Sequence, residues 1–228
     1  MAIAVSNLLS QATDILLDSG FTRWTQAELL RWLNAGRREI AILRPDLYSK
    51  ISVHTLSAGT KQTIPSDGNN FLDAIRNVAS DSVTPGRSVR VIEQEVLDAI
   101  KPNWHSETAS GTIKHFMFDE RTPKHFFVYP PAVANTKLEI RYSTTPVDVT
   151  ANDSLTDDEI WSSAIVDYVL YRAFSKDAEY TGNMARAAAH YTQFANTLGI
   201  SLKNRIVSSP NTANVGGAVP RVGLAAQS

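Results

Sequence analysis

The chain has 228 residues, of which 43% are hydrophobic and 20% charged, so it can bury a core and is not a disordered polypeptide. Its 22 basic and 23 acidic residues give a net charge of −1, which provides no electrostatic basis for binding nucleic acid over the whole surface. The absence of cysteine excludes disulfides and thiolate metal sites.

The beginning of the chain has neither the basic segment nor the uninterrupted apolar stretch of a signal peptide. No apolar run approaches the roughly 20 residues that span a bilayer. We therefore expect a soluble protein without a membrane partner.

Two helices are predicted in the first 46 residues. Apolar residues recur at helical spacing over Ile3–Ser19, and Gly20 is a natural C-terminal stop. Thr25 and Glu28 have the spacing of a capping box, which predicts the start of a second helix. Pro45 ends that helix because the residue before a proline avoids the helical region. The short connection predicts an antiparallel hairpin.

From residue 47 to residue 142 the pattern changes to short β-type runs separated by turn residues. The run at Lys137–Tyr142 alternates apolar and charged residues, as expected for a strand with one solvated face. A short helix is predicted at Glu93–Ile100, before Pro102. The expected strands of this antiparallel sheet are Ile51–Leu56, Gln62–Ile64, Ser88–Ile92, Ile113–Phe118, Lys124–Tyr129 and Lys137–Tyr142.

Helical periodicity returns after residue 155. A third helix is predicted from Asp157 to about Asp177, with Thr156 as its N-cap, and it is apolar nearly all round. Such a helix is central in a bundle or is covered by a neighbouring chain. We therefore expect packing between subunits through Trp161, Ile165 and Tyr168. A fourth helix is predicted from Gly182 to Leu198, closed by Gly199.

Residues 201–228 form a distinct tail with three basic residues, no acidic residue and no aromatic residue. It cannot bury enough surface to fold alone, but its spaced aliphatic residues suit an extended arm that lies along a partner. The residues predicted to bind that partner are Lys203, Arg205, Ile206, Val207, Arg221, Val222 and Leu224.

Together these elements predict an α+β protein. We expect an antiparallel four-helix bundle, formed by residues 1–46 and 156–200, because neither helical hairpin can bury its apolar stripe alone. Residues 47–155 form a β-rich antiparallel insert domain, and residues 201–228 form an extended C-terminal arm.

No catalytic constellation is recognisable, and we expect no enzyme, cofactor or metal. Phosphate-binding loops and nucleophile-elbow motifs are absent. Among the five histidines, the best metal hypothesis pairs His115 and His125 across the Asp119–Pro123 turn; the alternative is a simple cross-strand pair. The carboxylates Asp157, Asp158 and Glu159 are expected to cap a helix rather than to perform acid–base chemistry.

Two further features have a structural and a functional interpretation. Trp104 either fills the gap between the sheet and the short helix or is an exposed anchor for a partner. Arg37, Arg38 and Arg44 either form a basic binding face on the second helix or are its solvated side.

Several segments, taken in order, resemble the adaptor (head-to-tail connector) proteins of tailed bacteriophages. The resemblance covers most of residues 20–200, and the tail after Ser201 is its least recognisable part. The segments are Arg23-Trp24-Thr25 with Glu28–Asn34, Arg44-Pro45-Asp46, Gly59–Gln62 with Ile64-Pro65, Gly86-Arg87, Pro102–His105, Phe118–Arg121 with Pro123, Val128–Pro131, and Asp167–Ala173 with Ser175-Lys176-Asp177.

The resemblance implies a structural virion protein without enzymatic activity. Such adaptors form a ring beneath the portal, extend the DNA channel and bind tail or nozzle proteins; a ring on a twelve-fold portal holds twelve copies. It further implies that the protein is made in the host cytoplasm, lies at the head–tail interface, and meets DNA only as passing cargo. The alternatives are a tail-tube or tail-completion subunit and, from another class, a small metal-dependent hydrolase using His115, His125 and Asp119.

Overall fold

The computed structural model describes residues 2–155 and 161–208, with side chains described as far as Gly199. The chain divides into two compact units. Unit 1 combines residues 1–33 with residues 149–228, and unit 2 comprises residues 34–148. In the described residues there are five α-helices and ten strands, and the strands form three sheets.

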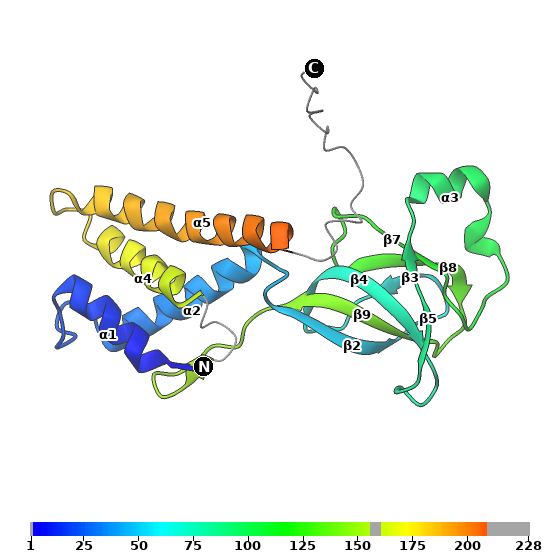
Figure 1. Cartoon of the computed structure of the whole chain (residues 1–228), viewed down its shortest axis with the longest axis horizontal. Helices are drawn as coiled ribbons and strands as arrows, with labels where there is room; N and C mark the ends of the chain where they lie inside the picture. The colour runs from blue at the N-terminus through cyan, green and yellow to red at the C-terminus, as the bar shows by residue number, and fades with distance from the viewer. Residues whose placement is uncertain (1, 156–160, 209–228) are drawn as a thin grey trace, which may run out of the picture. The chain divides into compact units, whose positions relative to one another are not determined.

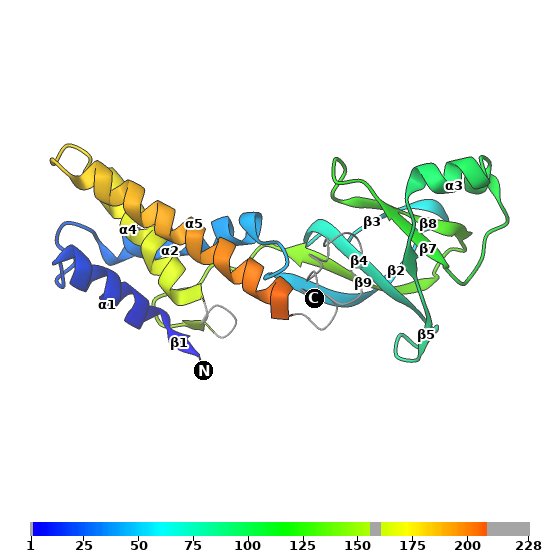
Figure 2. The same cartoon turned by 45° about the horizontal axis from the view of Figure 1, so that its top comes forward.

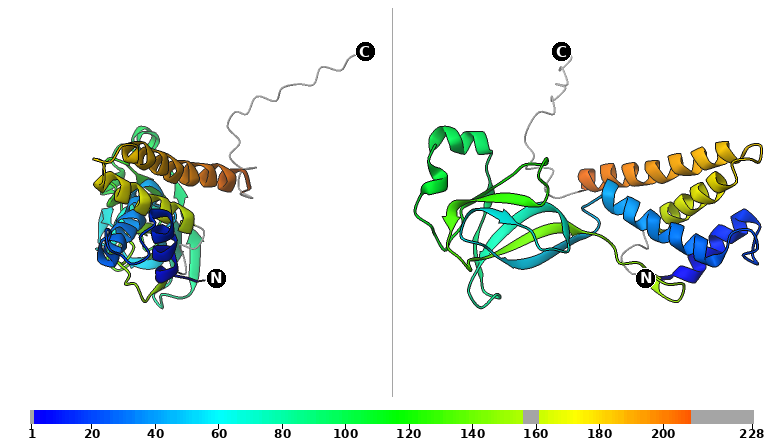
Figure 3. Two further views of the ribbon diagram at one scale, coloured as in Figure 1. Left: turned by 90° about the vertical axis from the view of Figure 1, so that its left-hand side faces the viewer. Right: turned by 180° about the vertical axis from the view of Figure 1, so that it is seen from behind.

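Unit 1 is helical (Figure 1). It contains α1 (Val5–Leu16), α4 (Ser162–Lys176), α5 (Asn183–Ser208) and the first half of α2 (Gln26–Leu43), with a small sheet of β1 (Ile3–Ala4) and β10 (Ser154–Leu155). Helix α4 lies between α1 and α5 (Figures 1 and 3). This central position explains its apolar sequence, because Ala164, Ile165, Val169, Leu170 and Ala173 are all buried within the unit.

The predicted antiparallel four-helix bundle is wrong. A bundle requires four helices that share one core along their lengths. Here α2 contributes Leu29 and Leu33 to unit 1, whereas Asn34–Leu43 belongs to unit 2. The extended arm is also wrong over residues 201–208, because α5 continues through Gly199 as far as Ser208. Residues 209–228 lie outside the described part of the chain.

The helix boundaries show which of the predicted capping and stop residues determine where the helices begin and end. The capping box is confirmed, since the Glu28 N–H donates to Thr25 Oγ1 at 3.3 Å and the Thr25 N–H donates to Glu28 Oε2 at 3.4 Å. Helix α2 ends at Leu43, as predicted from Pro45. Helix α1, however, ends at Leu16, before Gly20, and Leu17 follows as its C-cap in the left-handed conformation (φ 54°). The predicted N-cap Thr156 lies outside the described residues.

Unit 2 is built from two four-stranded sheets (Figure 2). One has the order β2-β9-β4-β5 and the other β3-β8-β7-β6. The sheets are not purely antiparallel as predicted, because β6 pairs with β7 in parallel. The elements are β2 (Ser49–Thr55), β3 (Gly59–Thr63), β4 (Gly68–Val78), β5 (Pro85–Ser88), β6 (Arg90–Val91), α3 (Gln94–Ile100), a 3-10 turn (Trp104–Ser106), β7 (His115–Phe118), β8 (His125–Ala132) and β9 (Lys137–Thr144).

Strand β4 is central to its sheet, although no strand was predicted there. Its register against β9 shifts at three places, so the buried positions recur every third residue at Gly68, Phe71, Ala74 and Asn77. A search for period-two alternation cannot find such a strand.

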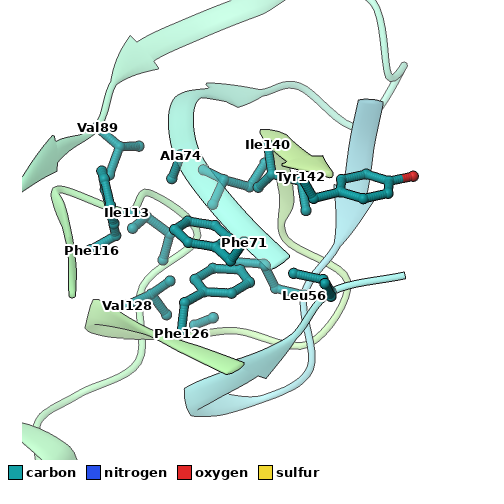
Figure 4. Close-up of a cluster of buried hydrophobic side chains, with 13 residues drawn as sticks. Leu56, Phe71, Ala74, Val89, Ile113, Phe116, Phe126, Val128, Ile140 and Tyr142 are labelled. Carbon is teal, nitrogen blue, oxygen red and sulfur yellow. The ribbon is translucent and has the colours of Figure 1, made fainter. Parts of the chain in front are cut away.

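The core of unit 2 contains side chains from both sheets (Figure 4). The rings of Phe71 on β4 and Phe126 on β8 stack with centroids 4.2 Å apart, and Phe116 on β7 meets Phe71 edge-on at 5.5 Å. Aromatic pairs in these geometries add stability beyond the area they bury.

Candidate interaction surfaces

The predicted histidine pair does not form. His115 lies opposite Tyr129 in the β7–β8 register, whereas His125 Nδ1 is 3.0 Å from Thr63 Oγ1 on β3. Asp119 Oδ1 accepts from the Arg121 N–H in the intervening turn. The residues of the hydrolase alternative are therefore not brought together, and in the described part of the chain no cluster of three acidic or histidine side chains suits a metal ion.

Trp104 is confirmed as a structural plug. It is fully buried with Leu97 of α3 and Met117 and Tyr129 of the sheet. Its indole N–H donates to Asp98 Oδ1 at 2.7 Å. Trp104 is therefore unavailable as an exposed anchor.

Arg37 and Arg38 of α2 and Arg44 just after it do not form one basic face. Arg37 is buried and donates to the Val147 carbonyl at 2.7 Å. Arg44 is buried and forms a bidentate contact with Asp46. Only Arg38 is partly exposed, where it pairs with Asp148. Both interpretations of this group were therefore incomplete, because Arg37 joins α2 to the segment at Val147 and Arg44 pairs with Asp46 just after the helix.

The residues predicted to pack between subunits are buried within the subunit itself. Trp161, Ile165 and Tyr168 are 4%, 0% and 8% exposed in the single chain. Of the predicted arm, Lys203, Arg205, Ile206 and Val207 lie on the last turns of α5, where only the backbone is described. The remaining three, Arg221, Val222 and Leu224, lie outside the described residues, as do Asp157, Asp158 and Glu159.

Two loops of unit 1 are joined by an ion pair that the sequence did not reveal. Arg23, before α2, donates through Nη2 to Asp177 Oδ1 at 2.8 Å, after α4. Its guanidinium also lies 4.9 Å from the ring centroid of Tyr180, a cation–π contact. In the same loop the Asp18 carboxylate accepts the N–H groups of Trp24, Thr22 and Arg23, which hold the pKa of Asp18 below its usual value.

These joined loops expose apolar side chains. Leu17 is 93% exposed, and Met184, at the start of α5, is 61% exposed. Aromatic residues, methionine and arginine together are typical of protein–protein interfaces. This end of unit 1 therefore has the composition of a contact surface.

The outward faces of α1 and α5 are poor in charge. Asp14 is the sole charged residue of α1, and its exposed neighbours are Ser6, Asn7, Ser10, Gln11 and Ile15. Between Asn183 and Gly199, α5 carries one permanent charge, Arg186, and exposes Met184, Ala185, Ala188, Tyr191 and Ala195. Helix α4 lies between α1 and α5, so the outward faces of α1 and α5 are on opposite sides of unit 1.

Unit 2 presents an acidic hollow of about 690 Å³ beside α3. Five carboxylates and a single arginine line it: Glu93, Glu95, Asp98, Asp119, Glu120 and Arg121. Its excess of negative charge disfavours contact with nucleic-acid phosphates.

The charge-poor faces and exposed apolar side chains of unit 1 have the composition of protein–protein contact surfaces. A protein-family model described as SU10 adaptor protein matches residues 3–215, so the chain belongs to the SU10 adaptor family. This confirms the resemblance to phage head-to-tail adaptors and identifies a structural component of a bacteriophage virion. No curated protein matches the chain. In the described residues no helix has the length and apolar character needed to cross a membrane.

Proposed function

We propose that this protein is the subunit of a homo-oligomeric ring that joins the capsid portal to the tail and extends the DNA channel. On a twelve-fold portal the ring holds twelve copies. Its partners are neighbouring copies, the portal protein and a tail or nozzle protein, and DNA is passing cargo. Membership of an adaptor family supports a role in joining virion components.

The observation that carries the ring is the pair of charge-poor faces on opposite sides of unit 1. A closed ring needs a head-to-tail interface, in which two different patches of the same subunit meet. Joining α1 of one copy to α5 of the next satisfies this requirement. Uncharged side chains cost less to desolvate than charged ones, and the single charges, Asp14 and Arg186, have opposite signs.

The C-terminal segment is the second part of the proposal. Lys203 and Arg205 lie on the last turns of α5 and Arg221 follows later in the sequence, and cations of this kind pair with carboxylates of a partner. We assign the tail to contacts outside its own subunit.

Reconstitution with the purified portal, followed by electron cryomicroscopy, tests the ring. We expect twelve copies directly beneath the portal. Ala188→Arg on the outward face of α5 should prevent ring closure, whereas Ala99→Arg on exposed α3 should not. Rings that stack as a tube away from the portal would instead identify a tail-tube subunit.

A second experiment tests the tail. Removing residues 209–228 keeps α5 at full length and should leave the melting curve unchanged while weakening docking to the portal-bound assembly. Unaffected docking would contradict the assignment of the tail but not of the ring.

A further inference from the structure

Four strands form the edges of the two sheets in unit 2, and three of them are protected. Strand β3 has a register shift next to Gly59, β5 begins with Pro85 beside another shift, and β6 has two residues. Short strands, bulges and prolines are the usual means by which proteins prevent pairing at an exposed edge.

Strand β2 has none of these protections. It is seven residues long, contains no proline and pairs with β9 without a register shift. None of its residues is buried, so its outer edge is open to solvent. Lys50, its one permanently charged residue, is held in an ion pair with Asp67. An edge of this length and regularity is a template for a further strand.

The hydrogen-bonding direction along β2 follows from its neighbours. The Leu56 N–H donates to the Thr136 carbonyl, and the Tyr48 carbonyl accepts from the Thr144 N–H. In an antiparallel pair, every second residue faces the partner strand. The even-numbered residues of β2 therefore face β9, and Ser49, Ile51, Val53 and Thr55 direct their N–H and C=O groups outward.

The same odd-numbered residues share one face of the sheet. Ile51 and Val53 are 50% and 37% exposed there, next to Arg141 and Glu139 of β9. An added strand with apolar residues at alternate positions would cover both aliphatic side chains as well as the main-chain groups.

We infer that β2 binds an extended strand supplied by residues 221–228 of a second copy of this chain. This inference rests on the proposed ring, in which the tail contacts a molecule other than its own subunit. It assigns the receiving surface to unit 2 of a neighbouring copy.

The tail has the composition that β2 requires. Val222 and Leu224 are two residues apart, so in an extended chain their side chains share the face that would meet Ile51 and Val53. Residues 222–228 contain no proline and no charged side chain, so their pairing buries no side-chain charge. The 12 residues from 209 to 220 can span about 40 Å when extended, which exceeds the diameter of a small domain of about 30 Å.

Thiol crosslinking tests this pairing, because the natural chain has no cysteine. Full-length Ile51→Cys and Leu224→Cys proteins are mixed under ring-forming conditions and treated with a short bis-maleimide. We expect a heterodimer as the dominant product. Val96→Cys on α3, which is 43% exposed, replaces Ile51→Cys in the control and should give little product. Equal yields from the two pairs would overturn the inference.

A chain carrying both Ile51→Cys and Leu224→Cys determines where the tail goes. Crosslinks between chains support pairing with a second copy, and crosslinks confined within one chain contradict it.

Blocking the edge provides the second measurement. Val53→Pro removes an outward N–H and should reduce the Ile51–Leu224 crosslinking rate about tenfold, as expected for a loss of about 1.4 kcal/mol. Val53→Lys should act similarly without altering the backbone, and circular dichroism verifies folding of both. Rings beneath the portal without this crosslink would refute the strand pairing alone, whereas the absence of any ring would refute the proposed function.

Discussion

Arg23 and Asp177 are 154 residues apart in the chain, yet they join the loop before α2 to the loop after α4. The Asp177 side chain is 9% exposed, whereas that of Arg23 is 47% exposed. Replacing the cation would therefore leave a largely buried carboxylate without its strongest partner.

We expect Arg23→Met to lower the unfolding temperature more than Asp177→Asn, because the neutral amide leaves no buried charge. Thermal denaturation followed by circular dichroism measures both. The double variant should be no less stable than Arg23→Met alone. If the effects of the two substitutions add, the ion pair does not couple the loops.

A substitution of Leu17 is expected to stabilise the protein, in contrast to the substitutions of Arg23 and Asp177. Its left-handed backbone costs an L-residue roughly 1–2 kcal/mol, and its side chain is almost fully exposed. Leu17→Gly removes that cost but adds unfolded-state entropy of roughly 0.5–1 kcal/mol. We expect a net stabilisation of up to about 1 kcal/mol in urea unfolding.

Leu17→Ala is the matched control, because it removes the same exposed side chain and keeps the strained backbone. It should change stability by less than about 0.5 kcal/mol. Equal effects of glycine and alanine would show that the backbone conformation is not the cause. A Leu17→Gly protein that is more stable but docks less well would place Leu17 in an interface.

Asn77 on β4 carries the third prediction. This buried amide donates to the carbonyls of Arg87 and Ile113, each at 2.8 Å, and accepts from the Ile113 N–H at 2.7 Å. Asn77→Ala removes all three hydrogen bonds, each contributing about 1 kcal/mol, so we expect a loss of about 3 kcal/mol in urea unfolding.

Asn69→Ala is the control on the same strand. Its amide makes one exposed hydrogen bond, to Thr145 Oγ1, and its loss should cost less than about 1 kcal/mol. Similar losses of stability from both variants would mean that the three buried hydrogen bonds of Asn77 contribute no more than the single exposed one of Asn69.

The elements predicted correctly depend on neighbouring residues in the sequence. The capping box of Thr25 and Glu28 and the stop before Pro45 need only local sterics and hydrogen bonding, and both were found. Gly199 failed as a stop because glycine permits a helix end without requiring one.

What escaped prediction depends on tertiary structure. Strand β4 was missed because its three register shifts replace the period-two pattern with a period of three. The His115–His125 pair was wrong because the β7–β8 register, not their distance from the turn, determines which residues face each other. The Arg23–Asp177 pair and the open edge of β2 have no local pattern at all. The adaptor family was recognisable because its short motifs occur in order along the sequence. Recognising them does not require the tertiary contacts.

Glu28 yields a pH-dependent prediction. Lys176 donates to Glu28 Oε1 at 2.8 Å, and this hydrogen bond, together with the Thr25 N–H, holds the pKa of Glu28 below its usual value. A carboxyl whose pKa is lower in the folded state contributes stability above its unfolded pKa, near 4.5, and loses that contribution as the pH falls through the folded pKa.

We therefore expect Glu28→Gln to destabilise the protein at pH 7 and to have a smaller effect at pH 3, as measured by urea unfolding at both values. Thr25→Ala, which removes the cap but leaves the ion pair with Lys176, should cost about 1 kcal/mol at pH 7. A Glu28→Gln loss that is the same at both pH values would show that the charge of Glu28 does not contribute.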